Sequence, residues 1–176
     1  MKRLLIVVDM QNDFVNGALG TAEAVKTVPA VIKKIKNFDG DVIYTKDTHS
    51  EQYLSTLEGR HLPIQHCKKG TDGWRLVPEI EKLFLDMQCR GFEKQGFGAK
   101  QLPEWIEKTY PEGPEEIVLI GLCTDICVLT NAIMLKVFFP QTEITVDAAC
   151  CAGVTPEGHA NALAAMRTCQ INIINA

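Results

Sequence analysis

Short runs of apolar residues alternate along this chain with longer segments in which apolar residues recur every three or four positions. The runs are residues 4–8, 41–45, 117–121, 143–146 and 170–174, with a less apolar one at 88–92. Strands that are buried on both faces have continuous apolar sequences, and their alternation with helices is typical of a parallel sheet covered on both sides. The sequence therefore predicts a three-layer α/β/α fold with a mainly parallel, six-stranded sheet.

The segments between these runs have the spacing of amphipathic helices. In residues 22–38 the apolar side chains fall along one helical face. Similar segments are residues 77–85, 102–109, 125–139 and 156–168. The last has a local start signal, because Thr155 can cap a helix and Pro156 suits its first position. A chain of 176 residues with 46% hydrophobic residues predicts one domain, residues 1–176.

Charge and cysteine content exclude several classes of protein. The net charge of -4 gives no basic surface for nucleic acid or for an anionic membrane, so we expect neither partner. Asp9 ends the first apolar run after five residues, which is too short for a signal peptide core. Seven cysteines, an odd number, argue against a disulfide scaffold and favour a reducing, cytoplasmic location.

A junction between a strand and a helix lies at residues 121–128, with the sequence GLCTDICV. Cys127 falls in the expected first helical turn, where unpaired N–H groups and the helix dipole stabilise a thiolate and can bind an oxyanion. This position suits a nucleophile. Free cysteine is also among the most frequently buried residues, so the local sequence leaves a packed core thiol as the alternative.

Asp9 comes directly after the first expected strand, in the sequence VDMQNDF. In an open parallel sheet, ligands bind beyond the carboxyl ends of the strands, so Asp9 and the turn that carries Cys127 could share one crevice. A carboxylate at that place can accept the thiol proton. The alternative is that Asp9 or Asp13 caps the segment that follows, as acidic residues after strands often do.

Lys94 follows the short expected strand, in the sequence FEKQGFGA. An ammonium group near a carboxylate and a thiol would stabilise the thiolate, and the small residues beside it would let a substrate approach. Taken alone, Lys94 would be assigned to the solvated surface, because lysine is rarely buried without a partner. The combination of the three segments is what indicates catalysis.

The segments VDMQNDF, FEKQGFGA and GLCTDICV occur in this order across nearly the whole chain. They resemble the motifs of the isochorismatase-like cysteine hydrolases, whose metal-containing branch is the nicotinamidases. The resemblance implies a general base at Asp9, its charge partner at Lys94 and a nucleophile at Cys127. It also implies a cis peptide between Leu122 and Cys123, with the N–H groups of Cys123 and Cys127 directed at the developing oxyanion.

The segment of residues 47–73 has neither strand nor helix periodicity, and it contains three of the four histidines. Asp47 and His49 are alternate residues of an extended segment, so they share a face and can bind one ion together with a distant third ligand such as His66. Two histidines and a carboxylate suit zinc, iron or manganese. Solvated loop side chains are the alternative.

This segment also resembles the metal loop of the nicotinamidases. The resemblance implies one divalent ion per chain, with zinc as the expected ion and iron or manganese as alternatives. It implies four ligands: Asp47, His49, Glu58 and His66. We choose Glu58 as the fourth ligand because its spacing from Asp47 fits the members that use glutamate, and His61 is the alternative.

Phe14 and Phe97 align with aromatic positions that flank the substrate ring in nicotinamidases, and apolar walls are usual in such pockets. The aromatic residue that is common before the last metal histidine is missing, and residues 63–65 have the sequence PIQ instead. This departure leaves the choice of amide open. Cys67, beside His66, is a bystander or a site of oxidation.

These features predict an amidohydrolase that converts nicotinamide to nicotinate and ammonia through a thioester on Cys127. A related hydrolase of carbamoyl, ureido or other small amides is one alternative. Another, from a different class, is a non-catalytic metal-binding or thiol redox module that uses Cys127 or Cys67. We expect a small-molecule amide as the substrate and a homo-oligomer, either a dimer or a tetramer.

Overall fold

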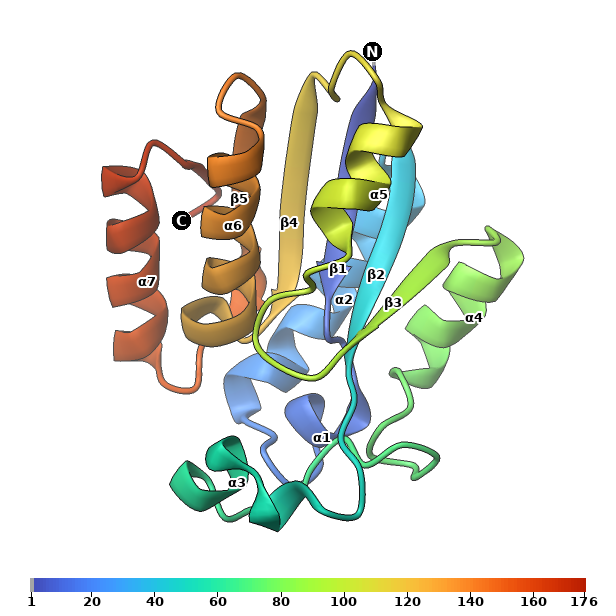
Figure 1. Cartoon of the computed structure of the whole chain (residues 1–176), viewed down its shortest axis with the longest axis vertical. Helices are drawn as coiled ribbons and strands as arrows, with labels where there is room; N and C mark the ends of the chain where they lie inside the picture. Colours follow the sequence, from blue (N-terminus) through green and yellow to red (C-terminus); the bar gives the residue numbers. More distant parts are fainter. Residues whose placement is uncertain (1) are drawn as a thin grey trace.

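The computed structural model describes residues 2–176 and has a six-stranded sheet at its centre (Figure 1). Its strands are β1 (Arg3–Val8), β2 (Asp41–Asp47), β3 (Arg90–Lys94), β4 (Glu116–Leu122), β5 (Glu143–Ala152) and β6 (Asn172–Ile174). They lie in the order β3-β2-β1-β4-β5-β6, and every neighbouring pair is parallel. The predicted parallel, six-stranded sheet is confirmed.

Helices cover both faces of the sheet (Figure 1). The helices are α1 (Asn12–Val15), α2 (Ala22–Asn37), α3 (Leu57–His61), α4 (Pro78–Asp86), α5 (Leu102–Thr109), α6 (Leu129–Phe138) and α7 (Pro156–Thr168). A 3-10 turn, η1 (Tyr53–Ser55), and a π-helical turn, η2 (Thr124–Val128), complete the list. Within residues 2–176, no helix has both the length and the hydrophobicity needed to cross a bilayer.

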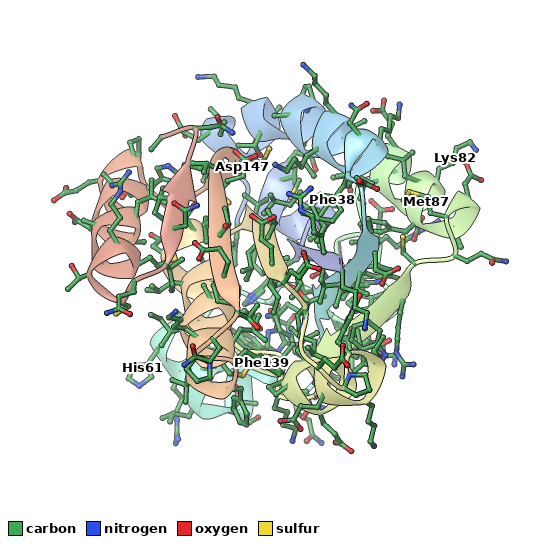
Figure 2. All side chains as sticks on the ribbon, turned by 90° about the horizontal axis from the view of Figure 1, so that it is seen from above. Phe38, His61, Lys82, Met87, Phe139 and Asp147 are labelled. Carbon is green, nitrogen blue, oxygen red and sulfur yellow. The ribbon has the colours of Figure 1, made fainter. Side chains whose placement is uncertain are left out.

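Alternate residues of the central strand β1 point into two separate cores. Leu4 and Ile6 pack with buried residues of α5, α6 and α7, whereas Leu5 and Val7 pack with buried residues of α1, α2 and α4. Seen from above, side chains fill both spaces, with Phe38 on one side of the sheet and Phe139 on the other (Figure 2). The three-layer α/β/α architecture follows from this alternation.

The strand boundaries differ from the prediction mainly in β5. The sequence predicts a strand over residues 143–146, but β5 continues to Ala152. Asp147 ends the apolar run in the sequence, yet its side chain is buried, because it pairs with the Lys34 ammonium at 2.8 Å. The other strands shift by a few residues, and β3 starts at Arg90 instead of residue 88.

The helical content also differs from the prediction in two places. Residues 125–139 were expected to form one helix, but the segment begins with the π-helical turn η2, and α6 starts only at Leu129. The segment of residues 47–73 contains η1 and α3, where no element was expected. Such short elements cover one turn or little more, so their sequences show no periodicity.

The order of the strands reverses between β1 and β4, which lie side by side at the centre of the sheet. The two strands approach closely at their carboxyl ends, since a Cβ atom on Gly121 would lie 2.1 Å from the Val8 carbonyl oxygen. Gly121 also has a φ of +115°, which only glycine adopts without strain. Ligands of open α/β sheets bind beyond such a reversal point, and Asp9 and Cys123 follow these two strands.

Candidate active site and metal centre

Asp9, Lys94 and Cys127 meet beyond the carboxyl ends of β1, β3 and β4. The Lys94 Nζ atom lies 2.7 Å from Asp9 Oδ2 and donates a hydrogen bond to Cys127 Sγ at 3.4 Å. All three side chains are buried. Lysine is rarely buried without a partner, and here its partners are a carboxylate and a thiol. The arrangement fits a base, a cation and a nucleophile in one site.

The surroundings of Asp9 make its carboxylate a better proton acceptor than an ordinary aspartate. Burial raises the pKa of Asp9, while the Lys94 ammonium and a hydrogen bond from Thr45 oppose the rise. The Thr45 hydroxyl donates to Asp9 Oδ1 at 2.6 Å. Thr45 was not singled out in the sequence, because a threonine within an apolar strand carries no signal of a polar partner.

Lys94 stays protonated despite its burial. Burial alone would lower the pKa of Lys94, but the carboxylates of Asp9 and Asp47 raise it above its ordinary value. The Nζ atom also lies 3.3 Å from Asp47 Oδ1. Lys94 therefore provides a permanent positive charge between the two carboxylates.

Cys127 lies in η2, directly after β4, and the turn is held by its own backbone. The N–H groups of Ile126 and Val128 both donate to the Cys123 carbonyl oxygen at 3.1 Å. The peptide between Leu122 and Cys123 is cis. Burial raises the pKa of the Cys127 thiol, and the charge of Asp9 raises it further, while Lys94 opposes both. The raised pKa favours the thiol form of Cys127, rather than the thiolate expected at a helix start.

Four potential metal ligands come together on one side of this site. Asp47, His49, Glu58 and His66 each present one ligand atom, and these atoms all lie within 4.8 Å of one another. The backbone N–H of His49 donates to the Cys67 carbonyl oxygen, which places the segment of residues 66–69 beside the end of β2. Thr56 caps α3, whose first turn carries Glu58. The ligand set thus depends on short backbone contacts within residues 47–69.

The distances within this cluster fit one divalent ion. His49 Nε2 lies 2.9 Å from Asp47 Oδ2 and 3.6 Å from Glu58 Oε1, and His66 Nε2 lies 3.5 and 3.9 Å from the same two oxygens. Four ligands at the usual bond lengths to zinc would be separated by about 3.4 Å in a tetrahedral arrangement. His66 Nδ1 bonds to the Ile64 carbonyl oxygen at 2.9 Å, which fixes the ring with Nε2 toward the cluster.

His61, the alternative fourth ligand, lies outside the cluster. Its side chain is exposed and points away from the body of the molecule (Figure 2). His61 lies at the end of α3, whereas Glu58 lies in the first turn of the same helix. Only Glu58 of the two faces the other three candidate ligands.

A cavity of about 270 Å³ lies between Cys127 and the cluster of candidate metal ligands. Its walls include Phe14, Phe97 and Cys127, together with three of the candidate metal ligands, and the rest of the lining is mostly apolar. Phe14 is buried and its ring centroid lies 5.6 Å from that of His66, whereas Phe97 is 49% exposed. The cavity can hold a small, flat and largely apolar molecule against the nucleophile.

Gln11 was missed in the sequence, although it lies in the segment VDMQNDF. Its side chain is fully buried and holds the backbone of Asp47 on both sides. Gln11 Oε1 accepts a hydrogen bond from the Asp47 N–H at 2.7 Å, and its Nε2 donates to the Asp47 carbonyl oxygen at 2.9 Å. The contact joins the loop after β1 to the end of β2. It can therefore position Asp47 both for its contact with Lys94 and for the cluster of candidate metal ligands.

Cys67 belongs to the backbone frame of this region. Its N–H donates to Asp13 Oδ2 at 2.7 Å, and its side chain is fully buried. Burial raises the pKa of the Cys67 thiol, so the thiolate required for nucleophilic attack or oxidation is disfavoured. These properties favour the bystander interpretation over a reactive cysteine.

Comparisons with known proteins agree with this geometry. The isochorismatase domain model matches residues 3–176. An isochorismatase family protein of Bacillus subtilis, PncA, described as uncharacterised, is 32% identical over 173 residues, which cover 93% of each chain. A crystal structure of a nicotinamidase/pyrazinamidase PncA from Bacillus subtilis aligns with a TM-score of 0.84 and 28% identity, over 98% of this chain and 99% of that one. The pyrazinamidase of Pyrococcus horikoshii in complex with zinc aligns over the whole of both chains, with a TM-score of 0.82 and 26% identity.

Proposed function

This chain belongs to the isochorismatase domain family, and from that premise we propose that it is an amidohydrolase that cleaves nicotinamide to nicotinate and ammonia. One observation carries the proposal: Cys127, which contacts the buried Lys94–Asp9 pair, borders the same small cavity as three of the candidate metal ligands. The similarity to structures of a nicotinamidase/pyrazinamidase and a pyrazinamidase supports the choice of a small aromatic carboxamide.

The proposed reaction begins with a proton transfer from Cys127 to Asp9. Because the thiol is buried and its pKa is raised, the Asp9 carboxylate takes the proton as the sulfur attacks the carbonyl carbon of the amide. The Lys94 ammonium, 3.4 Å from the sulfur, stabilises the charge on the thiolate. The carbonyl oxygen becomes an oxyanion, for which we propose the N–H groups of Cys123 and Cys127 as donors.

The remaining steps return both groups to their starting states. The oxyanion collapses, the carbon–nitrogen bond breaks, and the leaving amine takes the proton from Asp9 to depart as ammonia. A water molecule then attacks the thioester while Asp9 accepts one of its protons. Nicotinic acid leaves as the carbon–sulfur bond breaks, and the Asp9 proton returns to the Cys127 sulfur. The acid then ionises to nicotinate, and the released proton converts ammonia to ammonium.

We propose that Asp47, His49, Glu58 and His66 hold one divalent ion. Two imidazoles and two carboxylates suit zinc, iron or manganese, and the identity of the ion stays a proposal with zinc first. When bound, the ion supplies a Lewis acid that can hold the ring nitrogen of the substrate. Phe14 and Phe97 would enclose the ring from the apolar walls of the cavity. Ring and amide are then oriented toward Cys127.

The test is ammonia release from nicotinamide by the purified protein, with the metal content measured on the same samples. We expect release by the wild type and loss of release in Cys127→Ala. Cys169→Ala is the matched control, because Cys169 is exposed and lies at the end of α7. Activity that survives in Cys127→Ala would exclude the thioester. Bound metal without ammonia release would redirect the proposal to other amides, whereas absence of metal would favour a carbamoyl or ureido substrate.

Two further expectations from the sequence remain proposals. A cytoplasmic location is supported by seven cysteines without disulfides. A dimer or tetramer is supported by Val137 and Phe138, which are exposed apolar residues side by side at the end of α6. Sedimentation of the purified protein would decide the second point.

A further inference from the structure

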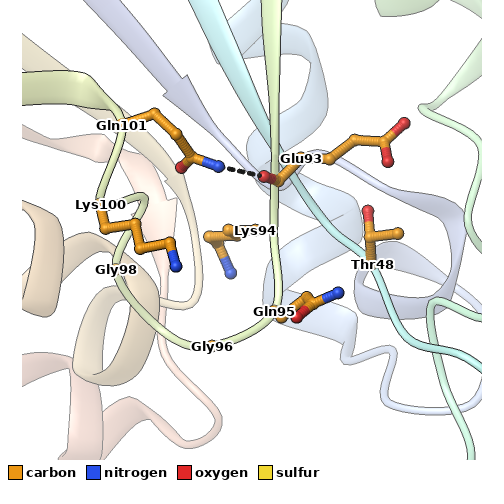
Figure 3. A pocket seen from close by; sticks show the side chains of 8 residues that line it. All are labelled: Thr48, Glu93, Lys94, Gln95, Gly96, Gly98, Lys100 and Gln101. Atoms are coloured by element: carbon orange, nitrogen blue, oxygen red, sulfur yellow. Dashed lines mark hydrogen bonds between the residues drawn. The ribbon is translucent and has the colours of Figure 1, made fainter. Parts of the chain in front are cut away.

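The loop that carries Phe97 is packed into the core at Ala99, which is fully buried, but it is open at Gly96. Residues 95–101 leave β3 and curve around the Lys94 side chain (Figure 3). Phe97 lines the substrate cavity of about 270 Å³, while Gly96 and Gly98 line a separate cavity of about 550 Å³ beside Lys94. A Cβ atom on Gly96 would meet no atom within 4 Å. Residues 96 and 97 therefore lie between two open spaces, and polar contacts are needed to keep Phe97 in one position.

The two ends of the loop are tied, but its centre has a single polar anchor. Gln101 Nε2 donates to the Glu93 carbonyl oxygen at 3.1 Å and closes the base of the loop (Figure 3). At the centre, Asn131 Nδ2 donates to the Phe97 carbonyl oxygen at 3.2 Å, and the Ala99 N–H donates to Asn131 Oδ1 at 2.9 Å. Among residues 2–176, no other group forms a hydrogen bond with the segment of residues 95–98.

Asn131, which lies in α6, also contacts the preceding turn η2, which carries Cys127. Its Nδ2 donates to the Cys127 carbonyl oxygen at 2.7 Å, one turn earlier along the chain. The side chain is fully buried, and each of its three hydrogen bonds connects the Phe97 loop or the Cys127 turn. Asn131 thus fixes the distance between an aromatic wall of the substrate cavity and the turn that bears the thiol.

We infer that Asn131 is a positioning residue that acts on substrate binding through Phe97. The predicted effect on KM and kcat rests on the proposed amidase function. Without Asn131, the loop loses its central anchor, and Phe97 samples positions away from the cavity. The substrate ring then binds less tightly, while Lys94 and Asp9 keep their contact with each other. The inference predicts a rise in KM with little change in kcat.

The test compares Asn131→Ser with Asn37→Ser. A serine at position 131 can still bond to the carbonyl one turn earlier, as Thr130 does to the Ile126 oxygen at 2.7 Å, but it is too short to reach the loop. Asn37 is the matched control, because its Nδ2 makes the same contact with Lys33 at 2.7 Å on the exposed face of α2. We expect Asn131→Ser to raise the KM for nicotinamide roughly tenfold and to change kcat less than about threefold. Asn37→Ser should change neither.

A double-mutant cycle with Phe97→Ala separates positioning from a general loss of structure. If Asn131 acts through the Phe97 side chain, Asn131→Ser should change KM less than about twofold in the Phe97→Ala background. Equal effects in both backgrounds, or a fall in kcat without a rise in KM, would overturn the inference. If Asn131→Ser does not fold, Asn131→Asp serves instead, since it keeps the acceptor for Ala99 and loses both donors.

Hydrogen exchange at the Ala99 amide provides a readout that does not depend on activity. The Ala99 N–H should be protected in the wild type and exchange faster in Asn131→Ser, with no change in Asn37→Ser. An Ala99 amide that exchanges equally in all three proteins would overturn the anchoring role. Absence of ammonia release by the wild type would refute the proposed function alone, and the exchange result would still decide whether Asn131 anchors the loop.

Discussion

The Lys94 ammonium lies 3.3 Å from Asp47 Oδ1, so the cation of the nucleophile site also contacts a candidate metal ligand. The second carboxylate oxygen of Asp47 faces the two histidines, 2.9 Å from His49 Nε2 and 3.5 Å from His66 Nε2. One carboxylate is therefore shared by the two centres. A change at Lys94 should consequently affect catalysis, stability and metal binding together.

We predict that Lys94→Met lowers kcat/KM for nicotinamide roughly a thousandfold, because the charge that supports the thiolate and the ionised Asp9 is lost. The change also leaves two buried carboxylates without their cation, which should lower the free energy of unfolding by about 3–5 kcal/mol. Urea unfolding and initial rates measure the two effects. Lys100→Met is the control, because Lys100 is exposed on the same loop. Near-wild-type rates in Lys94→Met would contradict the assigned role.

We predict that Glu58→Gln and His61→Gln have opposite outcomes for metal binding. Glu58 Oε1 lies 3.6 Å from His49 Nε2, so its replacement should weaken zinc binding by at least about tenfold. His61 is exposed on the same helix, and His61→Gln should bind zinc as the wild type does. Calorimetric titration of the metal-free protein with zinc gives both affinities. Weakened binding in His61→Gln with full affinity in Glu58→Gln would reverse the ligand assignment.

The sheet could be predicted from the sequence because buried strands leave continuous apolar runs, and the helices between them leave a periodic pattern. The prediction failed where a polar residue is buried with a partner from elsewhere. Asp147 seemed to end a strand only because its partner, Lys34, lies more than one hundred residues earlier in the chain. Such pairs are properties of the folded chain, and no local pattern indicates them.

The residues of the candidate site also divide into those that the sequence predicts and those that it does not. Asp9, Lys94 and Cys127 could be found because each lies in a recognisable segment at the end of a strand. Gln11 and Asn131 could not, because their partners are backbone atoms 36 and 34 residues away, respectively. A buried amide that bonds to backbone atoms has no sequence signature. The residues that orient a site are therefore harder to predict than those that react in it.

We predict that the acid limb of the pH profile moves upward in Thr45→Val. Burial raises the pKa of Asp9, and the Thr45 hydrogen bond opposes that rise. Asp9 accepts a proton only when ionised, so kcat/KM should fall as the pH drops through this raised pKa. Removing the Thr45 hydroxyl raises the pKa of Asp9 further, and the limb should shift to higher pH. Thr168→Val, on the exposed surface of α7, should leave the limb unshifted. A shift to lower pH would contradict the assignment of Asp9 as base.

We predict that Gln11→Met weakens metal binding although Gln11 is not a candidate ligand. The glutamine side chain holds the Asp47 N–H at 2.7 Å and the Asp47 carbonyl oxygen at 2.9 Å, and its Nε2 also donates to the Trp74 carbonyl oxygen at 2.9 Å. Methionine has a similar length and cannot replace these three bonds. The buried backbone groups that lose their partners should reduce the free energy of unfolding by about 1–3 kcal/mol.

The expected loss of zinc affinity in Gln11→Met is about 10- to 100-fold, as for other residues that hydrogen-bond to a metal ligand without contacting the metal. Gln52→Met is the matched control, because Gln52 is exposed near the same loop and its side chain makes no hydrogen bond within residues 2–176. Zinc titration and urea unfolding of the two variants separate the effects. Reduced stability with unchanged zinc affinity would mean that Gln11 supports the fold without orienting Asp47. If the loss in the free energy of zinc binding exceeds the loss in the free energy of unfolding, Gln11 acts on the metal site itself. The backbone of Asp47 must then be held on both sides for its carboxylate to contact both Lys94 and the metal ligands.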